Sequence, residues 1–196
     1  MFFVDAWPFI DGRAIVWVKD TVFADDYPDV KEKCGLINDN GEFIIPPIYD
    51  NMQYAGGTNI AVNVGFEEHE TYQESGGWGV IDMDRHVLIP LKYTDIQICK
   101  ESSLYIVEYE RKWGIINVFE EIIVPLKYEW LSWPDKYGWI LAKLGEKYGC
   151  ITMKEEVVVP FIYDDIMLHG AENLIPVKYG KQAFYIDRNR GHRILL

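Results

Sequence analysis

The chain has 196 residues and a formal net charge of −12 at pH 7, and 49% of its residues are hydrophobic and 15% aromatic. This apolar fraction is enough to bury a core and argues against a disordered chain. The acidic balance opposes direct nucleic-acid binding because phosphates repel an acidic surface, and no apolar run is long enough to predict a membrane span.

In chain order, three strand-like segments alternate along the sequence. The first is rich in β-branched and aromatic residues, which predicts a strand, and it recurs at residues 14–18, 60–64, 105–109, 140–143 and 175–178. The second is centred on a glycine and leads through a short polar turn to the third, an aliphatic run such as residues 42–45. We expect the proline after this run to end the third strand because proline lacks a backbone donor.

The spacing of three residue types is fixed. The glycines lie 44, 35 and 35 residues apart, a proline follows each by eleven residues, and a tyrosine follows each by fourteen. The copies contain Gly35, Pro46 and Tyr49; Gly79, Pro90 and Tyr93; Gly114, Pro125 and Tyr128; and Gly149, Pro160 and Tyr163. A fifth, degenerate copy is expected near Phe184. The sequence therefore predicts a 35-residue repeat.

The motif Trp113-Gly114-Ile115-Ile116, followed by Val124-Pro125-Leu126-Lys127-Tyr128, resembles the WG-repeat family. Cys34 and Tyr148 replace the tryptophan in two copies. The resemblance implies an all-β repeat domain whose relatives act mostly as interaction modules, and it brings no catalytic residues.

We therefore expect one all-β domain over residues 1–196, an array of about five units of three short antiparallel strands. Three strands per unit and unlike end units favour an open twisted array over a closed propeller. The repeated tyrosine is expected to bury its ring against the next unit and to bond its hydroxyl to the backbone, whereas a ligand-binding tyrosine ladder is the alternative.

Two insertions interrupt the repeat between its first and second strands, at residues 20–29 and 65–77. Insertions in repeat proteins map to loops, which often form the binding face. Residues 20–76 hold twelve acidic and two basic residues, whereas residues 176–196 carry a net charge of +4. We predict a partner-binding edge formed by the insert residues Asp25, Asp26, Tyr27, Asp29, Glu67, Glu68, His69, Glu70, Tyr72 and Glu74.

The sequence contains no motif that predicts catalysis, a cofactor or a metal site. The four histidines, His69, His86, His169 and His192, have no ligand spacing suited to zinc, and no phosphate loop or nucleophile motif is present. Three cysteines without framework spacing, together with an N-terminus unlike a secretory signal, indicate a reduced cytoplasmic protein.

Two functions of different classes fit these features. The first is a non-enzymatic protein-binding module, such as a bacterial immunity or antitoxin protein that blocks a basic cognate toxin through the acidic, aromatic edge. The second is binding of carbohydrate or a small ligand by exposed tryptophans, for which the candidates are Trp130, Trp133 and Trp139.

Overall fold

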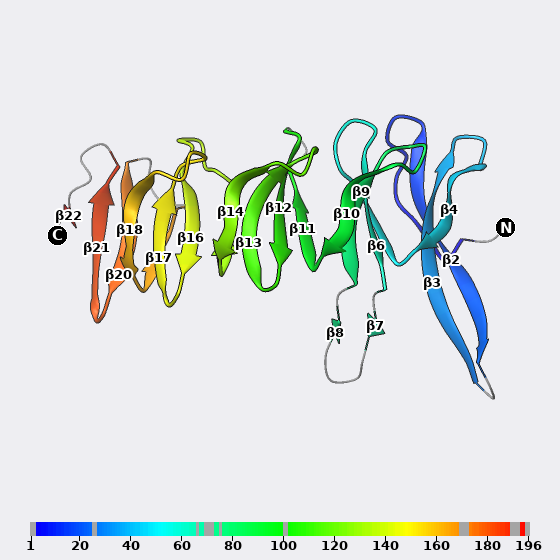
Figure 1. The fold of residues 1–196 in the computed structure, drawn as a ribbon, viewed down its shortest axis with the longest axis horizontal. Helices are drawn as coiled ribbons and strands as arrows, with labels where there is room; N and C mark the ends of the chain where they lie inside the picture. Colours follow the sequence, from blue (N-terminus) through cyan, green and yellow to red (C-terminus); the bar gives the residue numbers. More distant parts are fainter. Residues whose placement is uncertain are drawn as a thin grey trace. The chain divides into compact units, whose positions relative to one another are not determined.

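The computed structural model describes residues 3–24, 27–65, 67–68, 73–74, 76–99, 102–168, 173–188 and 193–194, with only the backbone described at 20–24, 27–31, 67–68, 73–74 and 193–194. All regular elements in these ranges are strands, as predicted (Figure 1). The chain divides into an N-terminal unit, Met1–Ser103 with Val118–Glu120, and a C-terminal unit, Leu104–Asn117 with Glu121–Leu196.

In the N-terminal unit two four-stranded sheets follow one another. The first has the order β1-β2-β3-β4, with β1 (Asp5–Ala6), β2 (Arg13–Ala24), β3 (Tyr27–Asn38) and β4 (Phe43–Tyr49). The second has the order β10-β9-β6-β5, with β5 (Asn51–Tyr54), β6 (Ile60–Val64), β9 (Gly77–Ile81) and β10 (Val87–Tyr93). The unit also contains the ribbon of β7 (Glu67–Glu68) with β8 (Gln73–Glu74), and the strand β11 (Asp95–Ile98).

The C-terminal unit repeats this arrangement. Its first ladder joins β12 (Leu104–Tyr109), β13 (Lys112–Asn117) and β14 (Ile122–Tyr128). The next sheet has the order β15-β16-β17-β18, with β15 (Trp130–Leu131), β16 (Ile140–Leu144), β17 (Lys147–Ile151) and β18 (Val157–Tyr163). The last has the order β19-β20-β21-β22, with β19 (Asp165–Ile166), β20 (Leu174–Tyr179), β21 (Gln182–Asp187) and β22 (Arg193–Ile194).

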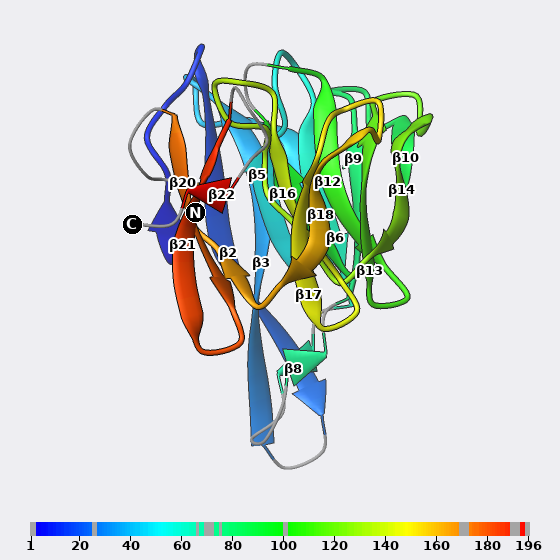
Figure 2. The same ribbon diagram turned by 90° about the vertical axis from the view of Figure 1, so that its left-hand side faces the viewer.

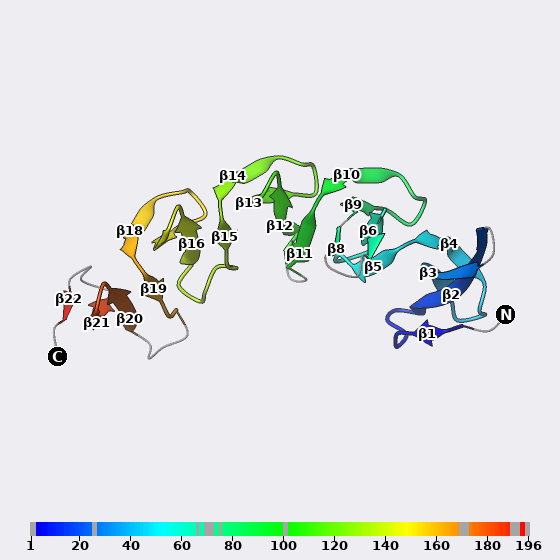
Figure 3. The same cartoon turned by 90° about the horizontal axis from the view of Figure 1, so that it is seen from below.

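The strand orders of the described sheets are linear, which is consistent with the predicted open array. Figure 3 shows β15 and β18 at opposite edges of their sheet. The structure adds a short strand to the three that the sequence predicts. Within a unit, the segment after the repeated tyrosine pairs with the first strand of the following repeat, as β5 does with β6, β15 with β16 and β19 with β20.

The hydrophobic cores lie between neighbouring sheets of a unit. In the N-terminal unit, Ile15, Leu36 and Ile45 of the first sheet pack with Met52, Ile60 and Val62 of the second. In the C-terminal unit one core joins β12–β14 to β15–β17, and another joins β17 and β18 to the last sheet, including Phe184 of the degenerate repeat. Each sheet therefore needs its neighbour to complete its hydrophobic core, as is expected of stacked repeats.

The repeated glycine is required by close backbone approach. A Cβ placed on Gly114 would lie 2.7 Å from the carbonyl oxygen of Val124, and one on Gly149 would lie 2.7 Å from that of Val159. The neighbouring aromatic is paired with the repeated tyrosine, as Trp113 is with Tyr128. Because both residues belong to one cross-strand pair, their separation along the sequence is fixed.

The expectation that proline ends the third strand is wrong. In the third repeat, Trp113 pairs with Tyr128 and Ile115 pairs with Val124, so Gly114 alone faces the segment from Pro125 to Lys127. Pro125 therefore lies within a bulge, where a missing backbone donor breaks no ladder bond, and the strand continues to the tyrosine.

The first insertion differs from the loop expected at this position. Its backbone extends β2 to Ala24 and begins β3 at Tyr27, with Phe23 opposite Pro28 and Ala24 opposite Tyr27. The β-branched and aromatic residues of 21–24 suit a strand, which explains why the hairpin lengthens instead of forming a loop. Figures 1 and 2 show this hairpin and the β7–β8 ribbon extending from the same side of the N-terminal unit.

Candidate functional site

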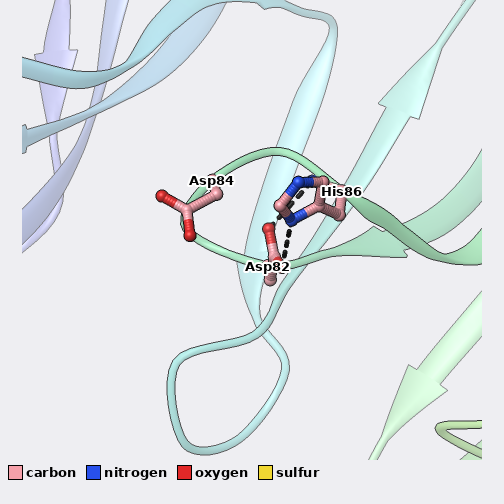
Figure 4. Close-up of side chains that lie close together, drawn as sticks. All are labelled: Asp82, Asp84 and His86. Atoms are coloured by element: carbon pink, nitrogen blue, oxygen red, sulfur yellow. Dashed lines mark hydrogen bonds and ion pairs between the residues drawn. The ribbon is translucent and has the colours of Figure 1, made fainter.

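The turn between β9 and β10 brings together three side chains that could ligate a metal. Asp82, Asp84 and His86 offer ligand atoms that lie within 4.8 Å of one another (Figure 4). Asp82 organises the turn: its Oδ1 accepts the backbone N–H of His86 at 2.8 Å, and its Oδ2 lies 2.9 Å from His86 Nδ1. In the sequence His86 is among the histidines without zinc-ligand spacing, and the alternation Asp82-x-Asp84-x-His86 is what brings the three side chains together in this turn.

The electrostatics of this turn favour an ion pair between two of the three side chains. The hydrogen bond to His86 lowers the pKa of Asp82, and the same bond raises the pKa of His86. A histidine stabilised in its protonated form must lose that proton before it can ligate a metal, so metal and proton compete for this ring.

The other repeats explain this pair as a variant of a turn cap. Asn38 donates to Glu42 across the equivalent turn at 2.8 Å, and Asn117 donates to Glu121 at 2.6 Å. In the second repeat the acid, Asp82, comes first and the donor, His86, comes second. The order of donor and acceptor is thus reversed, but a side-chain hydrogen bond still spans the turn. The geometry of Asp82 and His86 is therefore accounted for by the turn, and we assign no metal to it.

A second recurring contact links the buried tyrosine to a carboxylate of the next turn. The hydroxyl of Tyr93 donates to Glu120 Oε1 at 3.0 Å, and that of Tyr128 donates to Glu155 Oε1 at 3.2 Å. The rings are 3% and 2% exposed, which confirms the predicted burial. The hydroxyl partner is a side chain in both repeats and not the predicted backbone group.

A lysine before each tyrosine completes this contact. Lys92 forms an ion pair with Glu120 at 2.5 Å, and Lys127 pairs with Glu155. These lysines lower the pKa of each glutamate, chiefly through the hydrogen bond. The carboxylate is thus held charged by a lysine while it accepts a hydrogen bond from the tyrosine hydroxyl, which makes the tyrosine ladder a structural network.

A third recurring pair joins the residue two before the glycine to the residue after the tyrosine. Lys112 pairs with Glu129 at 2.7 Å, and Lys147 with Asp164 at 2.6 Å. The second oxygen of each acid accepts a backbone N–H of the next hairpin turn, from Gly145 and Gly180 respectively. The second repeat has Gly77 and Thr94 at these positions and so lacks both charges.

Near the C-terminal end of the described chain, a cation is enclosed by aromatic rings. The Arg188 guanidinium lies 4.5 Å from the Tyr137 ring centroid and 4.7 Å from that of Trp139, and its side chain is 7% exposed. Its Nη2 lies 2.5 Å from Asp135 Oδ2, whereas Nε and Nη1 are buried and have no hydrogen-bond acceptor among the residues that the structure describes. This cluster ties the loop 132–139 to the end of β21.

The recurring contacts therefore coincide with the residues that define the repeat. A family model for the WG containing repeat matches residues 35–58, 78–113, 113–148 and 148–182, more than half of the chain. The chain belongs to the WG containing repeat family. None of the curated proteins matches it.

The residues predicted to bind a partner lie on hairpins of this WG-repeat protein where the structure describes them. Tyr27 and Asp29 are on β3, Glu67 and Glu68 on β7, and Glu74 on β8. Their sequence order places them on two hairpins that occupy equivalent positions in successive WG repeats. The remaining predicted residues lie outside the described part of the chain: Asp25, Asp26, His69, Glu70 and Tyr72.

The tryptophans proposed for ligand binding differ in exposure. Trp130, on β15, is 39% exposed. Trp133 packs against the core between β12–β14 and β15–β17, and Trp139 packs against the core that includes Phe184. Two of the three rings thus serve the packing of the WG repeats.

No helix in the described ranges is long and apolar enough to cross a membrane.

Proposed function

We propose that this WG-repeat protein is a non-enzymatic module that binds a basic protein through the two acidic hairpins of its N-terminal unit. The supporting feature is the position of the insertions. Both lengthen the same hairpin, between the first and second strands of a repeat, in two successive repeats. Hairpins that extend past the sheets offer backbone and side chains that the repeat itself does not need for stacking.

The observation that carries the proposal is the register of β7 and β8. Glu67 is paired directly with Glu74, and Glu68 with Gln73. Like charges at directly opposed positions destabilise an antiparallel pair. A lysine or arginine from a partner would remove this repulsion, so binding of a basic surface would stabilise the ribbon as well as the complex.

In its narrower form, the proposal is that the protein is a cytoplasmic bacterial immunity protein whose acidic hairpins cover a basic toxin. The net charge of −12 supports this form, since an acidic inhibitor is steered rapidly to a basic target. The recurring ion pairs, such as Lys92 with Glu120 and Lys127 with Glu155, lie outside the two hairpins, which supports a role for the hairpins other than stacking.

The test begins with co-expression of the protein with those encoded beside it, followed by calorimetric titration of any basic partner at low and high salt. Replacing Glu67, Glu68 and Glu74 by glutamine should weaken binding by about tenfold and flatten its salt dependence, because charge pairs are lost. Equal affinity of the parent and this variant would remove the hairpins from the interface.

A charge-matched control separates local recognition from net charge. Asp39→Asn, Glu110→Gln and Glu146→Gln together remove the same three charges at exposed positions outside the insertions. This control should keep the affinity of the parent protein within about twofold. The narrower role requires a tight complex with a neighbouring toxin, and failure to form one excludes it.

A further inference from the structure

The third strand of each repeat begins with apolar residues that the core does not use. Three apolar residues precede each repeated proline, and only the last is fully buried: Ile45, Ile89, Val124 and Val159 are 0–1% exposed. The first of the three residues is exposed in the second to fourth repeats: Val87 is 58% exposed, Ile122 62% and Val157 59%. Stacking of the repeats therefore does not account for an aliphatic residue at this position.

A bulge at the start of the strand explains this exposure. Ile122 pairs with Ile116, and Val124 pairs with Ile115, so that Ile123 is an extra residue in the ladder. The same shift occurs where Val157 pairs with Ile151 and Val159 with Cys150. Because a bulge breaks the strict alternation of faces, the residues before it need not point into the core.

These aliphatic residues lie on edge strands. β14 and β18 are each the last strand of their sheet, and Figure 3 shows β18 at the margin of its sheet. The bulged proline in each strand hinders continuous pairing with another strand, which protects the edge from aggregation. The exposed side chains before the proline remain available for a more specific contact.

In the third and fourth repeats the exposed aliphatic residue follows an exposed glutamate, whereas Val87 of the second repeat follows His86. Glu121 precedes Ile122, and Glu156 precedes Val157. The carboxylate of Glu121 accepts from the side-chain amide of Asn117 at 2.6 Å, and that of Glu156 accepts from the hydroxyl of Thr152 at 3.4 Å. The described partners of both carboxylates are thus neutral groups of their own turns. Glu120 and Glu155, by contrast, form ion pairs with lysines that neutralise their charges.

We propose that Glu121, Ile122, Glu156 and Val157 form a docking surface for an extended segment of another protein that carries both basic and aliphatic side chains. The paired acid and aliphatic residues would select such a segment by charge and by burial of apolar area together. The surface lies in the C-terminal unit and uses none of the hairpin residues, so it goes beyond the proposed function and stands without it.

The probe is a short synthetic peptide of alternating lysine and valine, and its binding is followed by fluorescence anisotropy. Ile122→Thr with Val157→Thr removes the apolar groups but keeps β-branching, and thus strand propensity. We expect this double variant to bind about tenfold more weakly, with an unchanged unfolding transition. Met167→Thr, at an equally exposed position of 59% outside the surface, should bind as the parent does.

Two further comparisons test the charge and the site. Glu121→Gln with Glu156→Gln should flatten the salt dependence of peptide binding, and a lysine–serine peptide of equal charge should bind about tenfold more weakly than lysine–valine. The Glu67, Glu68 and Glu74 glutamine variant should bind the peptide normally. Absence of peptide binding, equal binding of both peptides, or loss only in the hairpin variant would overturn the proposal.

Discussion

At the scale of single residues, one cross-strand pair explains the signature of the repeat. The aromatic before the glycine is paired with the tyrosine, as Tyr148 is with Tyr163, and the bulged third strand approaches the glycine so closely that a side chain has no room there. Substitution of the glycine therefore disturbs the backbone of the third strand as well as that of the strand that contains the glycine.

Gly114→Ala is expected to destabilise the protein by about 2–4 kcal/mol, the range of strong steric and packing defects. The added methyl group would meet the Val124 carbonyl at 2.7 Å and the Leu126 backbone nitrogen at 2.9 Å, neither of which is a flexible side-chain end. Equilibrium urea unfolding gives the difference in free energy.

Gly145→Ala is the matched control. Gly145 has a φ of +61°, and nothing lies within 4 Å of an added Cβ. Its replacement should cost only about 1–2 kcal/mol, the cost of a left-handed conformation for a residue with a side chain. If both variants lose the same stability, close approach at Gly114 is not what the repeat requires.

The sequence predicts the burial of the tyrosine but not its hydroxyl partner. A fixed offset within one repeat identifies Tyr128 as a packing residue, whereas the acceptor, Glu155, belongs to the following repeat. Sequence spacing within a repeat cannot show which groups stacking brings together. A signal was present, however, because Lys92 with Glu120 and Lys127 with Glu155 recur at equivalent positions.

At the scale of elements, polar anchors connect the sheets alongside the apolar cores. Asp164 lies between a lysine of its own repeat and the turn of the next hairpin: Lys147 donates to Oδ1, and the N–H of Gly180 donates to Oδ2. The Lys147 hydrogen bond, followed by that of Gly180, lowers the pKa of Asp164. One carboxylate thus fixes the position of two strands relative to a turn.

Asp164→Asn should reduce the acid sensitivity of the fold. A carboxyl whose pKa is lowered by folding stabilises the protein fully above its unfolded pKa of about 3.9, and this stabilisation is lost as the pH falls through the lower folded value. The parent should therefore lose more stability than the variant between about pH 5 and pH 2. Thermal unfolding across this range measures the difference.

Glu146→Gln serves as the control for this acid titration. Glu146 is exposed and lies in the turn next to the Lys147 anchor. Its neutralisation should leave the pH dependence of unfolding close to that of the parent, since an exposed charge contributes little to stability. A variant at Asp164 with the parent's acid profile would show that the anchor adds no net stability.

The elements also show where sequence reasoning succeeds and where it fails. β-branched composition identifies the main strands, but the expectation for the proline was wrong because proline also fits a bulge. The additional short strand has only one recurring mark, an aliphatic residue seventeen positions after the glycine: Met52, Ile96, Leu131 and Ile166, all of them buried. Strands such as β15 (Trp130–Leu131) are too short for a periodicity signal.

At the scale of the whole molecule, each of the two units contains its own cores. Met52 belongs to the core of the N-terminal unit, and Leu131 belongs to a core of the C-terminal unit. They occupy the same position of the repeat, and both are 0% exposed. Contacts in a repeat array are made mainly with the adjacent repeat. A destabilising substitution should therefore promote local unfolding mainly in the unit that contains it.

Leu131→Ala is expected to cost about 2–5 kcal/mol and to increase hydrogen exchange most strongly in strands of the C-terminal unit, such as β13 and β17. Met52→Ala should cost a similar amount, with the largest increase in β3, β6 and β9 of the N-terminal unit. Native-state hydrogen exchange with mass spectrometry compares the two patterns directly. The same increase in both units for either variant would contradict this view, because it would mean that the array opens only as a whole. Opposite patterns would instead show that its stability is the sum of local repeat interfaces.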